Sequence, residues 1–257
     1  MHHWTWQAWH GNPYLTCDLL ARWPHGFFTR HFAPARPPEL VAALDAEATA
    51  FRTQQVHGNV VLDPAAITAL RTDEAHAPAD GCYSTATGQA MWTCTADCTP
   101  ALLGDVRTGQ VAAVHAGWRG TAQRIVPVAI EKMQAQGSRL ADLRVALGPA
   151  IDGTVYQVGR EVAAATGQSI FANGFDDQTM LLAHLQALQP PAILPDEAPD
   201  RLRLDVPQVN RLQLLELGLE DEQVAIAPHC TYQEPEQFFS YRRTGEKQVQ
   251  WSGIVSR

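Results

Sequence analysis

The sequence predicts a single α/β domain with a mixed sheet over residues 1–257, and three observations support this. Short apolar runs bounded by glycine and proline, typical of buried strands, alternate with longer segments whose apolar residues recur at helical spacing. Hydrophobic residues make up 46% of the 257 positions, which is enough to fill a substantial core. Neither an internal repeat nor a convincing inter-domain linker divides the chain. We therefore expect one folded unit that combines strands and helices.

Charge and composition exclude several classes of function. The net charge of -8 argues against a broad surface for nucleic acid or anionic membranes. No apolar run approaches the roughly 20 residues needed to span a bilayer, and the N-terminus lacks the apolar segment of a signal peptide. The 5 cysteines, an odd number at irregular spacings, fit a reducing compartment better than a disulfide framework. The sequence therefore predicts a cytoplasmic protein with neither a nucleic-acid nor a membrane partner.

The N-terminal third of the chain is expected to place one histidine beside a glycine. His57 stands immediately before Gly58 in a strand-like segment, and glycine there lets the backbone turn closely. A lone histidine is more often structural than functional, so His57 needs support from elsewhere in the chain. In chain order we expect a strand at 27–29, a proline-rich linker at 34–38, a helix at 39–51, the strand-like segment at 53–61, a loop at 71–81 and a short strand at 83–87.

The stretch from 92 to 120 concentrates the most reactive side chains. Apolar residues before Cys98 and around residues 102–103 predict two buried strands, and residues 106–110 supply the turn that returns the chain toward His115. A thiol and an imidazole would then lie at the ends of neighbouring strands. Two reactive side chains are therefore expected to meet.

A helix is expected directly after this stretch, at residues 121–136. Thr121 can cap it, Gly137 ends it and Pro127 should disturb its first half. Its N-terminal N–H groups would point toward His115 and favour an anion there. Beyond it we expect strands at 143–148, 202–204, 224–227, 238–243 and 249–255, helices ending near 165 and spanning 177–188 and 206–217, and a solvated excursion at 190–199. The turn at 148–153 has too few ordered glycines for a dinucleotide-binding loop.

Three residues form a candidate metal site: His57, Cys98 and His115. One thiolate and two imidazoles suit Zn²⁺, and a fourth position left to water would make the site catalytic. The intervals between the three residues match no local zinc-finger spacing, so only the fold can bring them together. A metal-free alternative makes Cys98 a nucleophile and His115 its general base. A purely structural metal clip is a further alternative.

Charged residues beside this group are candidates for catalysis and substrate binding. Asp97 could orient an imidazole or transfer a proton, although an aspartate in a tight turn more often caps the backbone. Arg119 could bind a phosphate or a carboxylate bidentately, as could Arg242 or Arg243 near the end of the chain. We therefore take Cys98, His115 and Asp97 as the catalytic candidates.

Several segments, in this order along the chain, resemble the YfiH family of laccase-domain proteins, also called the multicopper polyphenol oxidase or peptidoglycan-editing-factor family. The resemblance covers most of the chain from Gly26 onward, and the family's metal-binding positions fall on His57, Cys98 and His115. The segments are FTR at 28–30, QVHG at 55–58, ADG at 79–81, TADCTP at 95–100, HAGWRG at 115–120, GPAI at 148–151, YQVG at 156–159 and FSYRR at 239–243.

This resemblance implies a fold, an activity and a cofactor. The fold would be an α/β/α sandwich related to the cysteine-hydrolase fold. The activity would be purine nucleoside phosphorylase activity on adenosine, inosine and methylthioadenosine, together with adenosine deaminase activity, at a site holding Zn²⁺ or Cu²⁺. The substrate-binding residues are our own inference and not part of the resemblance: we take Arg119, Arg242 and Gln55 as the candidates. The expected partners are a purine nucleoside and phosphate, bound by a monomer or homodimer.

Two alternative functions remain open from the sequence. One is a peptidoglycan-editing cysteine hydrolase that acts on muramyl-peptide precursors through Cys98 and His115. The weaker one is a copper-dependent phenol oxidase, which would need many more histidines near one site. The chain also departs from the family at residues 31–38, 154–157 and 245–247. Substrate preference is the property that these departures affect most.

Overall fold

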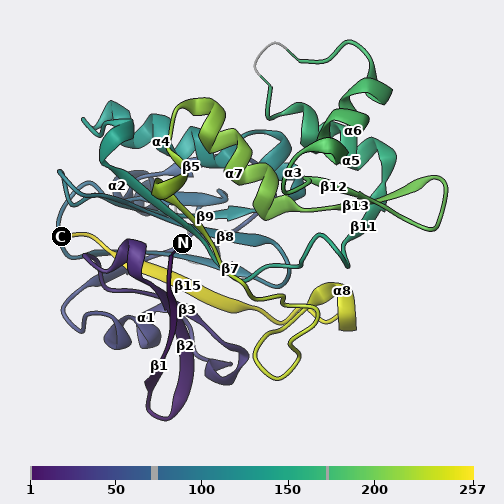
Figure 1. Cartoon of the computed structure of the whole chain (residues 1–257). Helices are drawn as coiled ribbons and strands as arrows, with labels where there is room; N and C mark the ends of the chain where they lie inside the picture. The colour runs from purple at the N-terminus through teal and green to yellow at the C-terminus, as the bar shows by residue number, and fades with distance from the viewer. Residues whose placement is uncertain (1, 71–74, 172–173) are drawn as a thin grey trace.

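Two large sheets stacked face to face form the centre of the molecule, and a small third sheet stands beside them (Figure 1). The structure, a computed structural model, describes residues 2–70, 75–171 and 174–257. The strands within these ranges are β1 (Trp4–Trp9), β2 (Asn12–Cys17), β3 (His25–Phe28), β4 (Thr49–Phe51), β5 (Val61–Leu62), β6 (Gly81–Tyr83), β7 (Gln89–Thr95), β8 (Thr99–Asp105), β9 (Val111–Ala116), β10 (Leu143–Leu147), β11 (Gln157–Gly159), β12 (Ile193–Pro195), β13 (Arg201–Leu204), β14 (Val224–Ile226) and β15 (Gln250–Val255). Their order is β1-β2-β3-β15-β7-β4 in one sheet, β14-β10-β8-β9-β6-β5 in the second and β11-β13-β12 in the third.

Helices cover the outer face of the second large sheet. Strand β8 is buried along its whole length, and its consecutive residues Leu102 and Leu103 pack on opposite sides. Leu102 lies in the core between the two large sheets, whereas Leu103 lies in the core beneath α4 and α7. The described helices are α1 (Pro37–Leu40), α2 (Pro64–Leu70), α3 (Trp118–Ala122), α4 (Ile125–Ala135), α5 (Arg160–Gln168), α6 (Gln178–Ala187), α7 (Val206–Leu217) and α8 (Tyr241–Thr244).

The predicted α/β fold with mixed pairing is confirmed. β4 pairs with β7 in parallel and β15 pairs with β7 antiparallel within one sheet. The strands are distributed over three sheets instead of the single sheet that we expected. The small sheet packs with α5 and α6 around a core of its own. The limits of one domain at residues 1–257 stay a prediction.

Several of the predicted elements are wrong. The strand expected at 83–87 contributes only Tyr83, the last residue of β6, and in three further cases tertiary contacts override local propensity. The expected helix at 39–51 stops at Leu40, passes through a short 3₁₀ turn, and gives way to β4, which pairs with β7. The expected strand at 238–243 is instead a turn leading into α8, where the Ser240 side chain accepts a hydrogen bond from the backbone N–H of Arg243. The excursion at 190–199 contains β12.

The predicted long helix at 121–136 is divided into α3 and α4. α3 already begins at Trp118, and Arg124 between the two helices has a left-handed φ of 58°. Thr121, the expected cap, is buried inside α3. Helix α7 follows the prediction, because Asp205 caps its first turn and Gly218 ends it in a left-handed conformation. The predicted loop at 71–81 lies partly outside the described residues.

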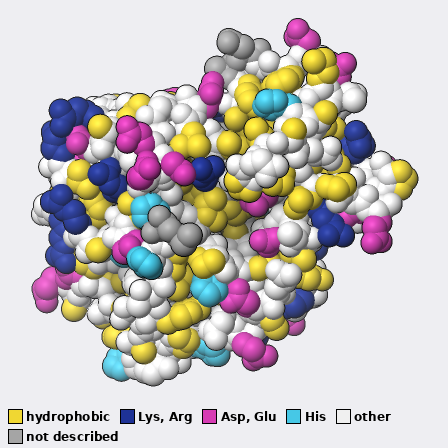
Figure 2. Space-filling model, in the orientation of Figure 1, with side chains coloured by type: hydrophobic (Ala, Val, Ile, Leu, Met, Phe, Trp, Pro, Cys, Tyr) yellow, Lys and Arg dark blue, Asp and Glu magenta, His cyan; other side chains and the backbone are white. Residues whose placement is uncertain are grey.

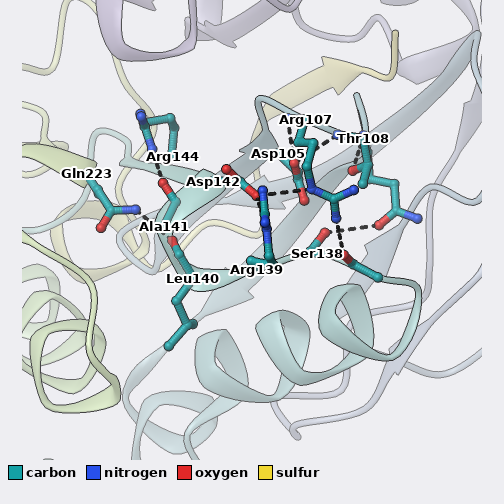
Figure 3. A network of polar contacts seen from close by, with 12 residues as sticks. Asp105, Arg107, Thr108, Ser138, Arg139, Leu140, Ala141, Asp142, Arg144 and Gln223 are labelled. Atoms are coloured by element: carbon teal, nitrogen blue, oxygen red, sulfur yellow. Dashed lines mark hydrogen bonds and ion pairs between the residues drawn. The ribbon is translucent and has the colours of Figure 1, made fainter.

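The turn between β8 and β9 lies at the opposite end of β8 from Cys98, and polar contacts hold it in place. Asp142 accepts hydrogen bonds from Nε of Arg107 (3.2 Å) and Nε of Arg139 (2.8 Å), as Figure 3 shows. These hydrogen bonds hold the pKa of the Asp142 carboxyl below its usual range. The contacts join the β8–β9 turn to the start of β10. They therefore hold one end of β8 and β9 in place, and the reactive residues lie at the opposite end of these two strands.

The surface carries no single sign of charge on the face shown in Figure 2. Lys and Arg side chains gather toward the left edge of that view, whereas acidic side chains are scattered over the face. Among the described residues, no helix is both long and apolar enough to cross a membrane.

Candidate active site

Three donor side chains converge where two strand ends and a loop meet. His57, Cys98 and His115 each offer one ligand atom, and these atoms all lie within 4.8 Å of one another. β8 and β9 pair antiparallel with Pro100 opposite His115, so the turn before β8 lies beside the end of β9. The structure therefore brings the predicted cysteine and histidine together, and His57 joins them.

His57 reaches this point from a loop, and not from the predicted strand at 53–61. Its φ of 62° lies in the left-handed region, which few residues other than glycine adopt. Val56 and Val60 are 52% and 47% exposed, so the segment has no buried face that would hold it in a sheet. At the two ends of the segment, Gln54 forms an isolated bridge to Pro78 and Val61 begins β5, but the residues between them pair with no strand.

Asp80 holds both this loop and His115, and reasoning from the sequence did not identify it as a site residue. The residue is 1% exposed. Its Oδ1 accepts hydrogen bonds from the backbone N–H of His57 (2.8 Å) and from Nδ1 of His115 (2.9 Å). Its Oδ2 accepts from the N–H groups of Val56 (3.1 Å) and Gly58 (2.7 Å). The sequence signal was the ADG motif, which the resemblance marked without giving it a role.

This carboxylate selects the tautomer of His115. An ionised carboxylate can only accept hydrogen bonds, so Nδ1 of His115 must carry the proton that it shares with Asp80. Nε2 of His115 is then the nitrogen available for a metal ion or for the Cys98 thiol.

The thiol and the imidazole also shift the pKa values of one another. Burial acts to raise the pKa of Cys98, but the charge of His115 and hydrogen bonds from both histidines outweigh it and lower the pKa to about 6. Burial acts to lower the pKa of His115, while the Cys98 thiolate and Asp80 raise it to about 9. Without metal, the site therefore holds a thiolate beside an imidazolium at neutral pH.

Two glycines of the HAGWRG motif let α3 lie directly against these groups. A Cβ on Gly117 would lie 2.7 Å from Sγ of Cys98, and a Cβ on Gly120 would lie 3.0 Å from the carbonyl oxygen of Gly58. A side chain at either position would displace a donor or its loop. Since α3 starts at Trp118 and is only five residues long, the helix N-terminus expected at Thr121 is not formed.

A cavity of about 640 Å³ opens onto the three donors, a size typical of small-molecule sites. Trp118 and Tyr156 supply aromatic walls, and both also pack against the core of the small sheet. Burial and the neighbouring Cys98 charge raise the pKa of Tyr156 to about 12. Its phenol therefore keeps its proton at neutral pH.

The two predicted anion-binding residues, Arg119 and Arg242, both line this cavity. Cζ of Arg119 lies 4.4 Å from the ring centroid of Trp118, and Cζ of Arg242 lies 4.7 Å from that of Tyr156. Nη1 of Arg242 donates to the carbonyl oxygen of Gln157 at 2.8 Å. Within the part of the chain that the structure describes, no carboxylate pairs with either guanidinium. Both charges are thus available to an anionic ligand, and their role stays a prediction.

Asp97 is engaged with protein groups on both oxygens. Oδ1 accepts from the Thr231 hydroxyl (2.7 Å) and Oδ2 from the backbone N–H of Arg242 (2.7 Å). The residue has a φ of 96° in the turn that presents Cys98. These contacts favour a positioning role for Asp97. Its predicted catalytic role is untested and stays a prediction.

Gln55, the third predicted substrate-binding residue, is fastened to β7. Its Nε2 donates to the carbonyl oxygen of Cys94 (2.7 Å), and its Oε1 accepts from the N–H of the same residue (2.8 Å). The side chain lines the cavity but anchors the loop that carries His57. Its contact with substrate stays a prediction.

The donor set fits a zinc ion. A thiolate and two imidazoles supply three tetrahedral positions, Asp80 orients one imidazole from behind, and the cavity leaves a fourth position for water or substrate. Asp80, His115 and Cys98 also reproduce the carboxylate–imidazole–thiol order of a metal-free nucleophilic site. In that arrangement His57 would only add a hydrogen bond to the thiolate, whereas in a metal site it supplies a third ligand.

Comparisons with known proteins identify relatives across the whole chain. The family profile described as multi-copper polyphenol oxidoreductase laccase matches residues 36–256. Purine nucleoside phosphorylase slr1573 from Synechocystis sp. is 55% identical over 256 residues, covering 98% of this chain and 97% of the relative. Adenosine deaminase RL5, from an unknown prokaryotic organism, is 32% identical over 180 residues, covering 69% and 63%. The crystal structure of YlmD from Geobacillus stearothermophilus matches with a TM-score of 0.80 at 24% identity over 98% of both chains.

Proposed function

We propose that this chain, which belongs to the multi-copper polyphenol oxidoreductase laccase family, is a purine nucleoside phosphorylase with adenosine deaminase activity. In phosphorolysis a phosphate oxygen forms a bond to C1′ of the ribose while the bond from C1′ to the purine nitrogen breaks. The products are the free base and ribose 1-phosphate, or 5-methylthioribose 1-phosphate when the substrate is methylthioadenosine. The observation that carries the proposal is the 55% identity, over nearly the full length of both chains, to a relative named purine nucleoside phosphorylase. Adenosine, inosine and methylthioadenosine are the proposed substrates.

We propose that His57, Cys98 and His115 hold a Zn²⁺ ion. The mutual approach of the three donor atoms within 4.8 Å supports this, as does the buried Asp80 behind His115. Bound zinc lowers the pKa of water and polarises substrate oxygen atoms. Cu²⁺ has a higher intrinsic affinity for such nitrogen and sulfur donors, so copper is the alternative occupant.

The remaining residues of the site would position the two substrates. Phosphorolysis needs the nucleoside and the phosphate held together in reacting geometry. Arg119 and Arg242 supply guanidinium groups without carboxylate partners among the described residues, and such groups suit the phosphate. Asp97 keeps the turn before Cys98 and the backbone of Arg242 in fixed relation, so it would hold the donor side and the phosphate side of the cavity together.

Deamination of adenosine is a second activity at the same site. A relative named adenosine deaminase is 32% identical over 69% of this chain, which favours this reaction specifically. Deamination replaces the amino group at C6 of the purine with oxygen from water and releases ammonia. Activation of water by zinc suits this chemistry, and the reaction requires no phosphate.

The proposed partners are small molecules, and the proposed location is the cytoplasm. All five cysteines are free thiols, which supports a reducing compartment. The choice between monomer and homodimer stays a prediction.

Product analysis of the zinc-loaded protein tests the proposal. We expect release of hypoxanthine from inosine only when phosphate is present, and conversion of adenosine to inosine with or without phosphate. Both reactions and the bound zinc should be lost in Cys98→Ala. Cys94→Ala is the matched control, because burial raises the pKa of the Cys94 thiol to about 12 and it is not one of the three donors. That variant should retain its zinc.

Folded, zinc-loaded protein that converts neither nucleoside would falsify the proposal. Cleavage of an amide in a muramyl peptide, with no effect on purines, would instead support the cysteine-hydrolase alternative. Copper-dependent oxygen uptake with a phenol would support the oxidase alternative.

A further inference from the structure

We infer that Tyr156 is a substrate-binding residue whose hydroxyl donates a hydrogen bond to the bound nucleoside. This inference rests on the proposed function and adds a residue that none of the predicted site assignments includes. It gives the neutral part of the substrate a partner of its own in the cavity wall.

Tyr156 is held rigidly before any substrate binds. Its backbone N–H donates to the carbonyl oxygen of Asp152 (3.1 Å), and its carbonyl oxygen accepts from the N–H of Leu204 (3.0 Å). The side chain packs against the core of the small sheet, and the Arg242 guanidinium lies over its ring at 4.7 Å. A side chain fixed in this way loses little conformational entropy when it contacts a ligand.

The hydroxyl of Tyr156 is the part of this side chain that is left for a ligand. It forms no hydrogen bond to any residue in the ranges that the structure describes, although the side chain is half buried and lines the cavity beside the three metal donors. The hydroxyl is also not among the buried polar atoms that the fold shuts away from the cavity. It is therefore free to donate a hydrogen bond to a molecule bound there.

The chemistry of the cavity assigns the acceptor of this hydrogen bond to the nucleoside and not to the phosphate. Three cations line the cavity, Arg119, Arg242 and Lys247, and these suit a phosphate dianion. A neutral phenol suits the uncharged acceptors of a nucleoside, namely the ribose oxygens, the ring nitrogens and the 6-oxygen of hypoxanthine. Because Arg242 covers one face of the ring, the hydroxyl is the more accessible contact for the substrate.

The test compares Tyr156→Phe with the wild type, both zinc-loaded and full length. The substitution removes the hydroxyl and keeps the ring beneath Arg242. We expect the dissociation constant for inosine, measured by calorimetry without phosphate, to rise about tenfold, with a matching rise in KM for inosine. The KM for phosphate should stay within about twofold. Tyr14→Phe is the matched control, since Tyr14 lies on β2, stacks on Phe28 and does not line this cavity.

Inosine binding in Tyr156→Phe within about twofold of the wild type would overturn the inference and leave the proposed function standing. A rise confined to the KM for phosphate would overturn it as well. If the wild type neither binds nor converts any purine nucleoside, the proposed function fails and this inference fails with it. Loss of zinc in Tyr156→Phe would show that the residue supports the metal site, which also contradicts a substrate-binding role.

Discussion

Replacing Asp80 by asparagine tests the link between the buried carboxylate and the metal donors. In the wild type the two oxygens of Asp80 accept hydrogen bonds from four N–H groups: those of Val56, His57 and Gly58 on the backbone, and Nδ1 of His115. Asparagine has nearly the same size but only one accepting oxygen. Two of the four N–H groups would therefore face an NH₂ donor instead of an acceptor.

The structure sets the size of the expected effect. A hydrogen bond to a charged group contributes about 1.5–3 kcal/mol, so losing two costs roughly 3–6 kcal/mol in total. If the hydrogen bond to His115 is lost, the imidazole is less firmly oriented and less basic as a metal ligand. Loss of such a partner typically weakens metal binding about 10- to 100-fold. If hydrogen bonds from the backbone N–H groups are lost, the loop that carries His57 is held less firmly and the free energy of unfolding falls.

Competition with a chromophoric chelator measures the zinc affinity, and thermal unfolding of the zinc-free protein measures the stability. Asp177→Asn is the control, because Asp177 caps α6 through its side chain and asparagine caps a helix equally well. A zinc affinity of Asp80→Asn within about threefold of the wild type, with unchanged Tm, would refute the reasoning.

Three further predictions follow from the geometry of the site and of α7. Gly117→Ala should weaken zinc binding about tenfold or more in the chelator assay, because its Cβ would lie 2.7 Å from Sγ of Cys98. In zinc-free protein, iodoacetamide should alkylate Cys98 with a midpoint near pH 6, since its pKa is lowered to about 6, while Cys94, with a pKa raised to about 12, stays unmodified. Burial raises the pKa of Asp205 to about 6, so its stabilising effect is complete below the ordinary value of 3.8 and is lost as the pH rises through 6. Asp205→Asn should therefore raise Tm relative to the wild type more at pH 7.5 than at pH 4.5.

Each of these predictions has a result that contradicts it. Unchanged zinc affinity in Gly117→Ala would mean that the thiol can move without cost. An alkylation midpoint close to that of a free thiol would mean that His115 and His57 do not stabilise the thiolate. A Tm difference for Asp205→Asn that is the same at both pH values would mean that Asp205 titrates alike in the folded and unfolded chain.

The sequence predicts the donors of the site better than it predicts their support. Cys98 and His115 could be placed because they stand at the ends of continuous apolar runs, whose pairing as β8 and β9 follows from the short turn between them. Asp80 could not be placed in this way. Its role depends on three successive backbone N–H groups turning toward one carboxylate, and no side-chain pattern encodes that turn.

The missed secondary structure has a similar origin. The segment 39–51 as a whole has helical composition, yet its last three residues form β4 because the edge of β7 offers them a hydrogen-bonded ladder. The N-terminal hairpin of β1 and β2 was not expected, since its turn is His10-Gly11, with φ values of 48° and 81°, and not the more familiar Asn-Gly. Both features are set by partners distant in the chain or by a rare backbone conformation, and local composition reports neither.

The walls of the cavity are anchored in two different cores. Cys98 and His115 stand at the ends of β8 and β9, whose apolar residues fill the cores on both sides of the second large sheet, whereas Trp118 and Tyr156 pack against the small sheet. Substitutions within the small core can therefore shift the aromatic walls of the cavity without disturbing the three donor side chains. The shape of the cavity and the geometry of the donors can thus change independently of one another.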